Sequence, residues 1–251
     1  MRLPGEFVLA RDGVAVRHGY ESELDAWLGG GPCAPAGELA GRDAAVSDGR
    51  GAARVVMLRA GGRAFVRRYV HGGLLGALLR DVYWQRPPRP WRELLATEAA
   101  RHAGVLAPEV LAAAVLPACG RRAGLLYRGV LVTRALDGRR SLREALCAAP
   151  GAAERLAWIA CAVRAIRRLH AAGIHHPDLN VANVLVGEGD DTPAALIDFD
   201  RASVWPQAVG PLRVALARRR LSRSIAKLGL PGLDRAGACR ALRAAGLGTP
   251  S

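Results

Sequence analysis

The sequence predicts an α+β fold of two lobes, a small β-rich N-lobe followed by a mainly helical C-lobe. Three observations support this class: short apolar runs around glycine turns in the first half, a long helical period in the second, and a polar loop between short apolar strands near residue 180. The 251 residues, 51% of them hydrophobic, suffice for one large domain or two lobes.

The order of these patterns divides the chain into three segments. Residues 1–37 contain Gly- and Pro-rich stretches and little periodicity, so we expect an N-terminal extension that is partly loose. Residues 38–134 are assigned to the N-lobe and residues 135–251 to the C-lobe.

Within the N-lobe, residues 55–58 and 64–70 read as neighbouring strands around a turn at residues 60–62. A strand is also expected at residues 129–133. A helix begins at Pro90, since proline is tolerated in a first helical turn, and Gly104 is its end signal. It carries Glu93 and Glu98.

The C-lobe begins with a capping box, Ser141-Leu142-Arg143-Glu144, which predicts the start of a helix. A longer helix is expected at residues 153–172, ended by Gly173, with an inward apolar stripe. The stripe consists of Leu156, Ile159, Val163, Ile166 and Leu169.

The most informative stretch follows directly: His176-Pro177-Asp178-Leu179-Asn180-Val181-Ala182-Asn183. Apolar strands are expected at residues 184–186 and 194–197, and the second leads into Asp198. An Asp, an Asn five residues later and a second Asp beyond a strand form the phosphoryl-transfer core of the protein-kinase-like fold.

The chemistry of phosphoryl transfer explains this spacing, because the protein must position reactants and neutralise charge. Asp178 would take the proton of the attacking hydroxyl. Asn183 and Asp198 would offer oxygen ligands to Mg²⁺, which bridges the terminal phosphates of ATP. Alternatively, Asp178 and Asn183 are turn residues. His176 reads as a core histidine that braces the loop, and Asp200 as a third carboxylate near the metal or a loop cap.

The chain resembles the 3-deoxy-D-manno-octulosonic acid (Kdo) kinase family, lipopolysaccharide-core kinases of the protein-kinase-like superfamily. Three elements carry the resemblance, which extends over residues 49–227: Gly173-Ile174-His175-His176-Pro177-Asp178-Leu179-Asn180, Leu196-Ile197-Asp198-Phe199-Asp200-Arg201, and Val66-Arg67-Arg68-Tyr69-Val70-His71-Gly72-Gly73-Leu74. It implies ATP-dependent phosphorylation of the 4-hydroxyl of a Kdo sugar on a lipid A precursor, at the cytoplasmic face of the bacterial inner membrane.

Candidate ATP-binding residues lie mainly in the N-lobe. Gly49 and Gly51 are candidates for a glycine-rich turn over the phosphates, although a two-glycine hairpin reads the same way. The only lysine, Lys227, lies beyond the catalytic loop, so Arg67 takes the position where kinases place a phosphate-pairing lysine. Arg67 as a plain surface residue is the alternative.

One glutamate of the helix should pair with Arg67, and the resemblance favours Glu93. Asn180 is a further candidate ATP-binding residue, since it stands where many kinases keep a lysine against the γ-phosphate. Arg201 could supply that charge instead.

Charge and cysteine usage bear on partners and location. The net charge of +14 suits an anionic membrane surface or phosphorylated substrates, and no nucleic-acid-binding motif accompanies it, so nucleic acid is not expected. A basic helix at residues 213–227 has an apolar face at Leu212, Leu216, Leu221, Ile225 and Leu228. It would lie on lipid headgroups or pack on the lower lobe. Five scattered cysteines without a C-x-x-C pair indicate reduced thiols and the cytosol.

The sequence therefore predicts an ATP-dependent sugar kinase, peripheral to the membrane, that acts on a Kdo glycolipid. Pro177 and the lack of an Ala-Pro-Glu motif after Asp200 favour small-molecule over protein acceptors. The alternatives are another sugar or small-molecule kinase of heptose or aminoglycoside type, a nucleotide-binding pseudokinase, and a non-enzymatic binder of membranes or nucleic acid.

Overall fold

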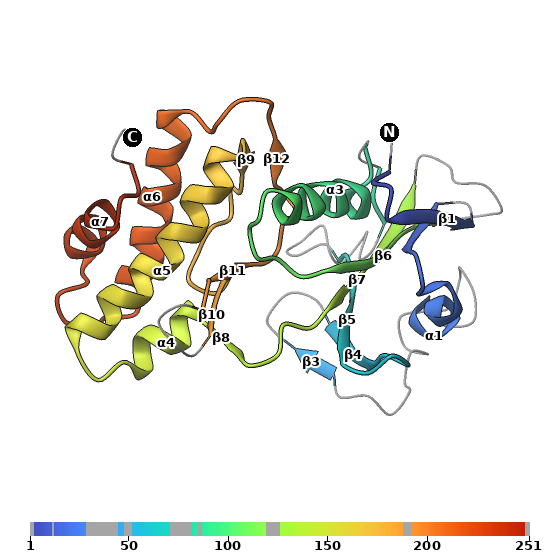
Figure 1. Ribbon diagram of the computed structural model, residues 1–251, viewed down its shortest axis with the longest axis horizontal. Coiled ribbons are helices and arrows are strands. Elements are labelled where there is room, and N and C mark those ends of the chain that lie inside the picture. The colour runs from blue at the N-terminus through green and yellow to red at the C-terminus, as the bar shows by residue number, and fades with distance from the viewer. Residues whose placement is uncertain are drawn as a thin grey trace. The chain divides into compact units, whose positions relative to one another are not determined.

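The computed structural model describes residues 3–11, 13–28, 45–47, 52–70, 82–84, 87–118, 126–187 and 192–248. The chain divides into two compact units. Unit 1 comprises Met1–Leu95 and Glu109–Ala135, and unit 2 comprises Ala96–Pro108 and Leu136–Ser251. Unit 1 is built around a large β-sheet and unit 2 is mainly helical, as the predicted α+β class requires (Figure 1).

Among the described residues, the sheet of unit 1 has seven antiparallel strands in the order β1-β2-β6-β7-β5-β4-β3. Its strands are β1 (Phe7–Arg11), β2 (Val14–Arg17), β3 (Ala45–Ser47), β4 (Ala52–Met57), β5 (Arg63–Arg68), β6 (Val110–Pro117) and β7 (Tyr127–Arg134). Strands β4, β5 and β7 match the predicted runs within a few residues. Gly61 and Gly62, in the predicted turn, both have positive φ angles, which glycine adopts without strain.

Alternating side chains of this sheet build two apolar clusters. Val130 and Val132 of β7 face one cluster, and Leu131 between them faces the other. The short helices η1 (Glu21–Glu23) and α1 (Leu24–Leu28) cover the first cluster with Trp27. The helix α3 (Arg89–His102) contributes Leu94 to the second. Strand β7 is therefore buried on both faces.

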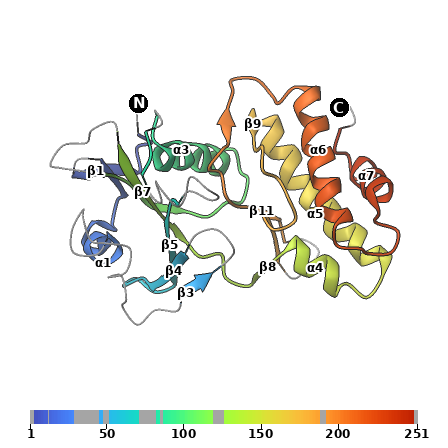
Figure 2. The same ribbon diagram turned by 180° about the vertical axis from the view of Figure 1, so that it is seen from behind.

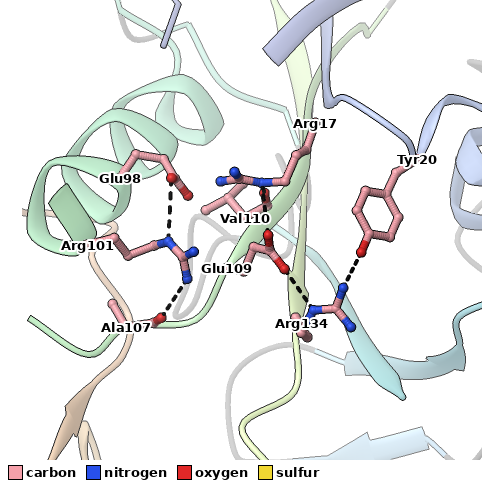
Figure 3. Close-up of polar contacts among 8 residues, drawn as sticks. All are labelled: Arg17, Tyr20, Glu98, Arg101, Ala107, Glu109, Val110 and Arg134. Carbon is pink, nitrogen blue, oxygen red and sulfur yellow. Dashed lines mark hydrogen bonds and ion pairs between the residues drawn. The ribbon is translucent and has the colours of Figure 1, made fainter. Parts of the chain in front are cut away.

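The N-terminal segment differs from the expectation of a separate, partly loose extension. Strands β1 and β2 extend the sheet, because β2 pairs with β6. Polar contacts fix the same segment (Figure 3): Arg17 donates to the carbonyl oxygen of Val110 at 2.8 Å, and Glu109 accepts from Arg134 Nε at 2.7 Å. Arg134 also donates to the hydroxyl of Tyr20. Within residues 1–37, those numbered 3–11 and 13–28 thus belong to unit 1, and Val14, Val16 and Trp27 lie in its core.

Unit 2 also includes a segment that the sequence assigns to the N-lobe, whose expected end is residue 134. Residues 96–108 belong to unit 2. There, the backbone N–H of Leu196 donates to the carbonyl oxygen of Leu106 at 2.9 Å, and Arg168 donates to the carbonyl oxygen of Gly104. The expected boundary after β7 is therefore only one of the places where the chain passes from one unit to the other.

Four helices and five short strands follow in the described part of unit 2: β8 (Arg139–Ser141), α4 (Leu142–Ala148), α5 (Ala152–Ala171), β9 (Ile174–His175), β10 (Val184–Gly187), β11 (Ala195–Leu196), β12 (Ser203–Val204), α6 (Pro211–Ala226) and α7 (Arg235–Ala244). The capping box opens α4 as predicted, with Ser141 and Glu144 bonded reciprocally. Helices α6 and α7 lie beside α5 in both views (Figure 2).

The predicted stripe of α5 is correct from Ile159 onward, where each member is buried in the core of unit 2. Leu156 is instead exposed, because the apolar cluster begins only at Ile159. Helix α6 packs in the core of unit 2 mainly through its later turns. Leu221 and Ile225 are buried in the core, whereas Leu212 and Leu216 are exposed.

Two tryptophans allow a test of the N-terminal segment. Trp27 of α1 is 1% exposed and Trp84 is 53% exposed. We expect Trp27→Ala to lower the free energy of unfolding by about 3–5 kcal/mol, because it leaves a cavity in the core. Trp84→Ala should change it by less than about 1 kcal/mol. Urea denaturation of both variants checks this, and equal losses would contradict the placement of α1 in the core.

A second expectation concerns pH. Burial, and then the neighbouring His175 and His176, lower the pKa of His170 to about 4. The folded chain therefore keeps His170 neutral, while the unfolded chain protonates it below about pH 6.5. Stability should be full above about pH 6.5 and fall by about 3 kcal/mol as the pH drops towards 4. Thermal unfolding of wild type and His170→Gln at pH 7 and 5 measures this. Parallel losses in the two proteins would show that His170 is not responsible.

Candidate functional site

In unit 1, the predicted pairing residue Arg67 contacts a buried carboxylate. Arg67 of β5 donates to Glu93 Oε1, and the Tyr69 hydroxyl donates to Glu93 Oε2. The Arg67 guanidinium carbon also lies 5.2 Å from the centre of the Tyr69 ring. Glu93 is buried, so both of its oxygens are satisfied by protein donors.

The local structure explains why these residues meet. Val66 of β5 points into the apolar cluster under α1, so Arg67 and Tyr69 point to the opposite face, which α3 covers. The first turns of α3 place Glu93 there. Glu98 serves differently: within unit 2 its carboxylate pairs with Arg101 at 3.5 Å, and Arg101 donates to the carbonyl oxygen of Ala107 (Figure 3). Arg67 thus pairs with Glu93, the partner that the resemblance favoured.

In unit 2, residues 176–183 form the loop between β9 and β10, called the catalytic loop below. The backbone carbonyl oxygen of Asp178 accepts hydrogen bonds from the side-chain nitrogens of Asn180 and Asn183, each at 2.9 Å. Asn180 Oδ1 accepts from the backbone N–H of Ala182 at 2.8 Å, which closes an Asx-turn. Both polar ends of the Asn180 side chain are thus used within the loop.

Asn183 links Asp178 to the strand that precedes Asp198. Its side-chain nitrogen bonds to Asp178, which leaves its Oδ1 atom as the oxygen it can offer to a cation. Its backbone carbonyl oxygen accepts from the N–H of Ile197 at 3.1 Å. These bonds connect Asp178 to Asn183 and Asn183 to the residue that precedes Asp198.

Asp198 has a φ angle of 66°, in the left-handed region that residues other than glycine rarely adopt, although aspartate tolerates it better than most. Such backbone strain is concentrated at functional sites. Asp198 is exposed, while Phe199 and Asp200 are buried. The strained turn thus presents one carboxylate outward and seats the next two residues in the core.

His176 braces the loop, as expected. Its ring is buried, its Nε2 donates to the carbonyl oxygen of Ile197 at 3.0 Å, and it packs against Phe199 with ring centres 5.2 Å apart. Burial lowers the pKa of His176, against the opposing effects of the Ile197 carbonyl, Asp198 and Asp178. Its burial and its bond to the Ile197 carbonyl oxygen suit a brace of the loop.

Arg220, which no sequence pattern places at the site, also contacts Asp178. Its Nη1 donates to Asp178 Oδ1 at 3.0 Å, and Arg201 Nη1 lies 4.0 Å from Asp178 Oδ2. Arg220 is 42 positions from Asp178 along the chain, so no local pattern could reveal the contact. Tyr69 was also missed as a partner of Glu93, although its two-residue spacing from Arg67 was a usable signal.

Two predicted ATP-binding residues, Gly49 and Gly51, lie outside the described residues, in the sequence between β3 and β4. Among the residues that are described, no group of three or more His, Cys, Asp or Glu side chains could hold a metal ion. Asn183 and Asp198 alone still fit Mg²⁺, since this ion is usually held by one or two carboxylates together with substrate phosphates.

Comparisons with known proteins bear on the family and the fold of this chain. The model of the lipopolysaccharide kinase (Kdo/WaaP) family matches residues 39–209. A 3-deoxy-D-manno-octulosonic acid kinase of Vibrio cholerae is 34% identical over 142 residues, which are 55% of this chain and 56% of that protein. One from Xylella fastidiosa is 34% identical over 192 residues, 75% of this chain and 72% of that protein. The matched region spans little more than half of the Vibrio protein.

Among solved structures, that of WaaP in complex with acyl carrier protein is similar, with a TM-score of 0.54 and 18% identity. The likeness covers 81% of this chain and 79% of WaaP. It confirms the predicted protein-kinase-like fold. With the family match over most of its length and the sequence identity to curated relatives, the chain belongs to the lipopolysaccharide kinase (Kdo/WaaP) family.

Proposed function

We propose that this chain is an ATP-dependent sugar kinase that phosphorylates the 4-hydroxyl of a Kdo sugar on a lipid A precursor, a step of lipopolysaccharide core biosynthesis. The observation that carries the proposal is a pair of hydrogen bonds at Asn183. Its side-chain nitrogen donates to the Asp178 carbonyl oxygen, and its own carbonyl oxygen accepts from the N–H of Ile197, the residue before Asp198. These bonds support a phosphoryl-transfer site formed by Asp178, Asn183 and Asp198. The names of the curated relatives support the choice of acceptor.

In this reaction the acceptor oxygen forms a bond to the γ-phosphorus of ATP. The bond from that phosphorus to the bridging oxygen breaks, and ADP leaves. Asp178 accepts a hydrogen bond from the acceptor hydroxyl, orients it, and takes its proton as the new bond forms. The Asp178 carboxylate is half exposed and accessible to an acceptor, which suits this role.

Asn183 Oδ1 and the Asp198 carboxylate would hold Mg²⁺, which when bound neutralises phosphate charge. Arg67, held by Glu93 and Tyr69, would bind ATP phosphates, and the glycines Gly49 and Gly51 would cover them. The Asn180 side chain already donates one hydrogen bond and accepts one within the loop. It would contact the nucleotide through its second N–H or the second lone pair of its Oδ1 atom.

We further infer that the protein works peripherally at an anionic lipid surface, the cytoplasmic face of the bacterial inner membrane. In the described part of the chain, no helix combines the length and the apolar character needed to cross a bilayer. Four exposed apolar side chains lie around the start of α6, and we call them the α6 apolar surface: Val204, Trp205, Leu212 and Leu216.

Basic groups accompany this surface. The Arg213 guanidinium carbon lies 4.5 Å from the centre of the Trp205 ring. Helix α6 contains five arginines and no acidic residue. Apolar side chains that insert between headgroups and cations that pair with anionic lipids are the two requirements of interfacial binding.

Phosphoryl transfer tests the proposed reaction. We expect purified protein with γ-labelled ATP, Mg²⁺ and a Kdo-bearing lipid A precursor to label the glycolipid. Asp178→Asn should lower kcat by about 100-fold or more, because it removes the proton acceptor. Asp198→Asn should weaken Mg²⁺-dependent nucleotide binding, measured by calorimetry.

The outcomes separate the alternatives. Transfer to heptose or aminoglycoside acceptors, and not to Kdo, would replace the substrate and keep the kinase. Nucleotide binding without turnover on any acceptor would favour the pseudokinase. That alternative is suggested by the absence of a lysine at position 67.

Vesicle binding tests the lipid surface. The double variant Leu212→Glu, Leu216→Glu should bind phosphatidylglycerol-containing vesicles at least about 10-fold more weakly. The wild-type leucines would be buried in the lipid on binding, and the loss of two such side chains accounts for a change of this size. Leu9→Glu, Leu156→Glu makes the same charge change at two other exposed leucines and is the control. Transfer in detergent should be unchanged in the control variant. Equal loss of binding in both would indicate general charge repulsion rather than this surface.

A further inference from the structure

The carboxylate of Asp178 is shared by two arginines that come from different parts of unit 2. Arg220 of α6 contacts Oδ1 at 3.0 Å, and Arg201 lies 4.0 Å from Oδ2. The side chains of Asp178 and Arg220 are each 44% exposed, and that of Arg201 is 70% exposed. Exposed ion pairs contribute little to stability, so these contacts are not explained as supports of the fold.

Helix α6 is fixed to the catalytic loop independently of this ion pair. Ser224 Oγ accepts a hydrogen bond from the backbone N–H of Val181 at 3.2 Å. Leu221 and Ile225 anchor the same turns in the core. Ser224 lies four residues after Arg220, on the same side of the helix, so the bond holds Arg220 beside the loop.

Arg220 also occupies an oxygen that the proposed reaction needs. Asp178 must accept the acceptor hydroxyl, yet Oδ1 already accepts from Arg220 and Oδ2 lies near Arg201. A cation that stays on the base would compete with the substrate. This competition ends if the acceptor carries an anionic group of its own, because the Arg220 guanidinium can then bind that group and leave Asp178.

The substrate named for the curated relatives is an acid, and its carboxylate is ionised at neutral pH. A guanidinium fork matches a carboxylate with two parallel hydrogen bonds. We propose that Arg220 binds the carboxylate of the acid sugar acceptor and, in doing so, releases Asp178 Oδ1 for the hydroxyl. This inference rests on the proposed function and adds the group that recognises the acceptor.

The surroundings of Arg220 favour an anion. His175 is half buried, and its pKa is lowered first by burial and then by the charges of Arg213 and Arg220, which places both guanidinium groups near its ring. Arg201, Arg213 and Arg220 thus lie near the Asp178 carboxylate or the adjacent strand β9. An exchange of partners at Arg220 costs little, because the pair it leaves is half exposed.

The test combines a protein change with a substrate change. Wild type, Arg220→Ala and Arg220→Lys are assayed in neutral detergent with the Kdo acceptor and with its carboxamide, which keeps the shape and removes the charge. Arg219→Ala, exposed on the same helix, is the matched control. KM for ATP and ATP hydrolysis without acceptor are measured alongside.

We expect wild type to lose about 10- to 100-fold in kcat/KM on the carboxamide, as for other charge-assisted hydrogen bonds. Arg220→Ala should show a similar loss on the acid, mainly through KM, and should no longer distinguish the two acceptors. Arg220→Lys should recover part of the loss, and Arg219→Ala should behave as wild type.

Two results would overturn the inference while leaving the kinase intact. One is an Arg220→Ala protein that still prefers the acid as strongly as wild type does. The other is a loss confined to ATP, with a raised KM for ATP or slower ATP hydrolysis, which would assign Arg220 to the nucleotide phosphates. Wild type that transfers no phosphate to the acid, although it binds nucleotide, would overturn the proposed function and the inference with it.

Discussion

The backbone carbonyl oxygen of Asp178 is the point on which the catalytic loop depends. It accepts from two asparagine side chains, and the same residues bond to the loop backbone and to the strand before Asp198. Because the carbonyl carries this structural role, the Asp178 carboxylate is not required to hold the loop. The side chain can therefore exchange partners during a reaction without loss of the loop conformation, which is what a proton acceptor requires.

A second constraint is the near absence of lysine from the chain. On the proposed function, arginine would then take the place of lysine at the ATP phosphates, and its planar fork needs a more defined position than an ammonium group. The contacts of Arg67 supply it: Glu93 fixes the guanidinium from one side, and the Tyr69 ring lies alongside. Tyr69 in turn bonds to the second oxygen of Glu93, so the carboxylate is buried without an unsatisfied atom.

Local patterns in the sequence were sufficient where neighbours along the chain decide the structure. The capping box at Ser141, the long helix α5 and the loop from His176 to Asn183 were all predicted, because each depends on spacing within a few turns. The N-terminal hairpin was not predicted, since its place is decided by pairing with β6, about a hundred residues away. The exposure of Leu156 and the contact of Arg220 with Asp178 likewise depend on which distant element covers a helix face.

Helix α6 carries an exposed apolar surface, a contact to Asp178 and a bond to the catalytic loop on one element. Leu212, Leu216, Arg220 and Ser224 recur every four residues, so they form one slowly turning stripe with about 6 Å between successive members. The stripe begins with exposed leucines, continues with the arginine on Asp178, and ends with the hydroxyl bonded to the catalytic loop. On the proposed function, a lipid-anchored acid sugar would meet the apolar end first and the arginine a turn later. The rigidity of the helix would then fix the distance between the lipid surface and Asp178. An acceptor would be phosphorylated only if its sugar hydroxyl lies at that distance from its lipid anchor.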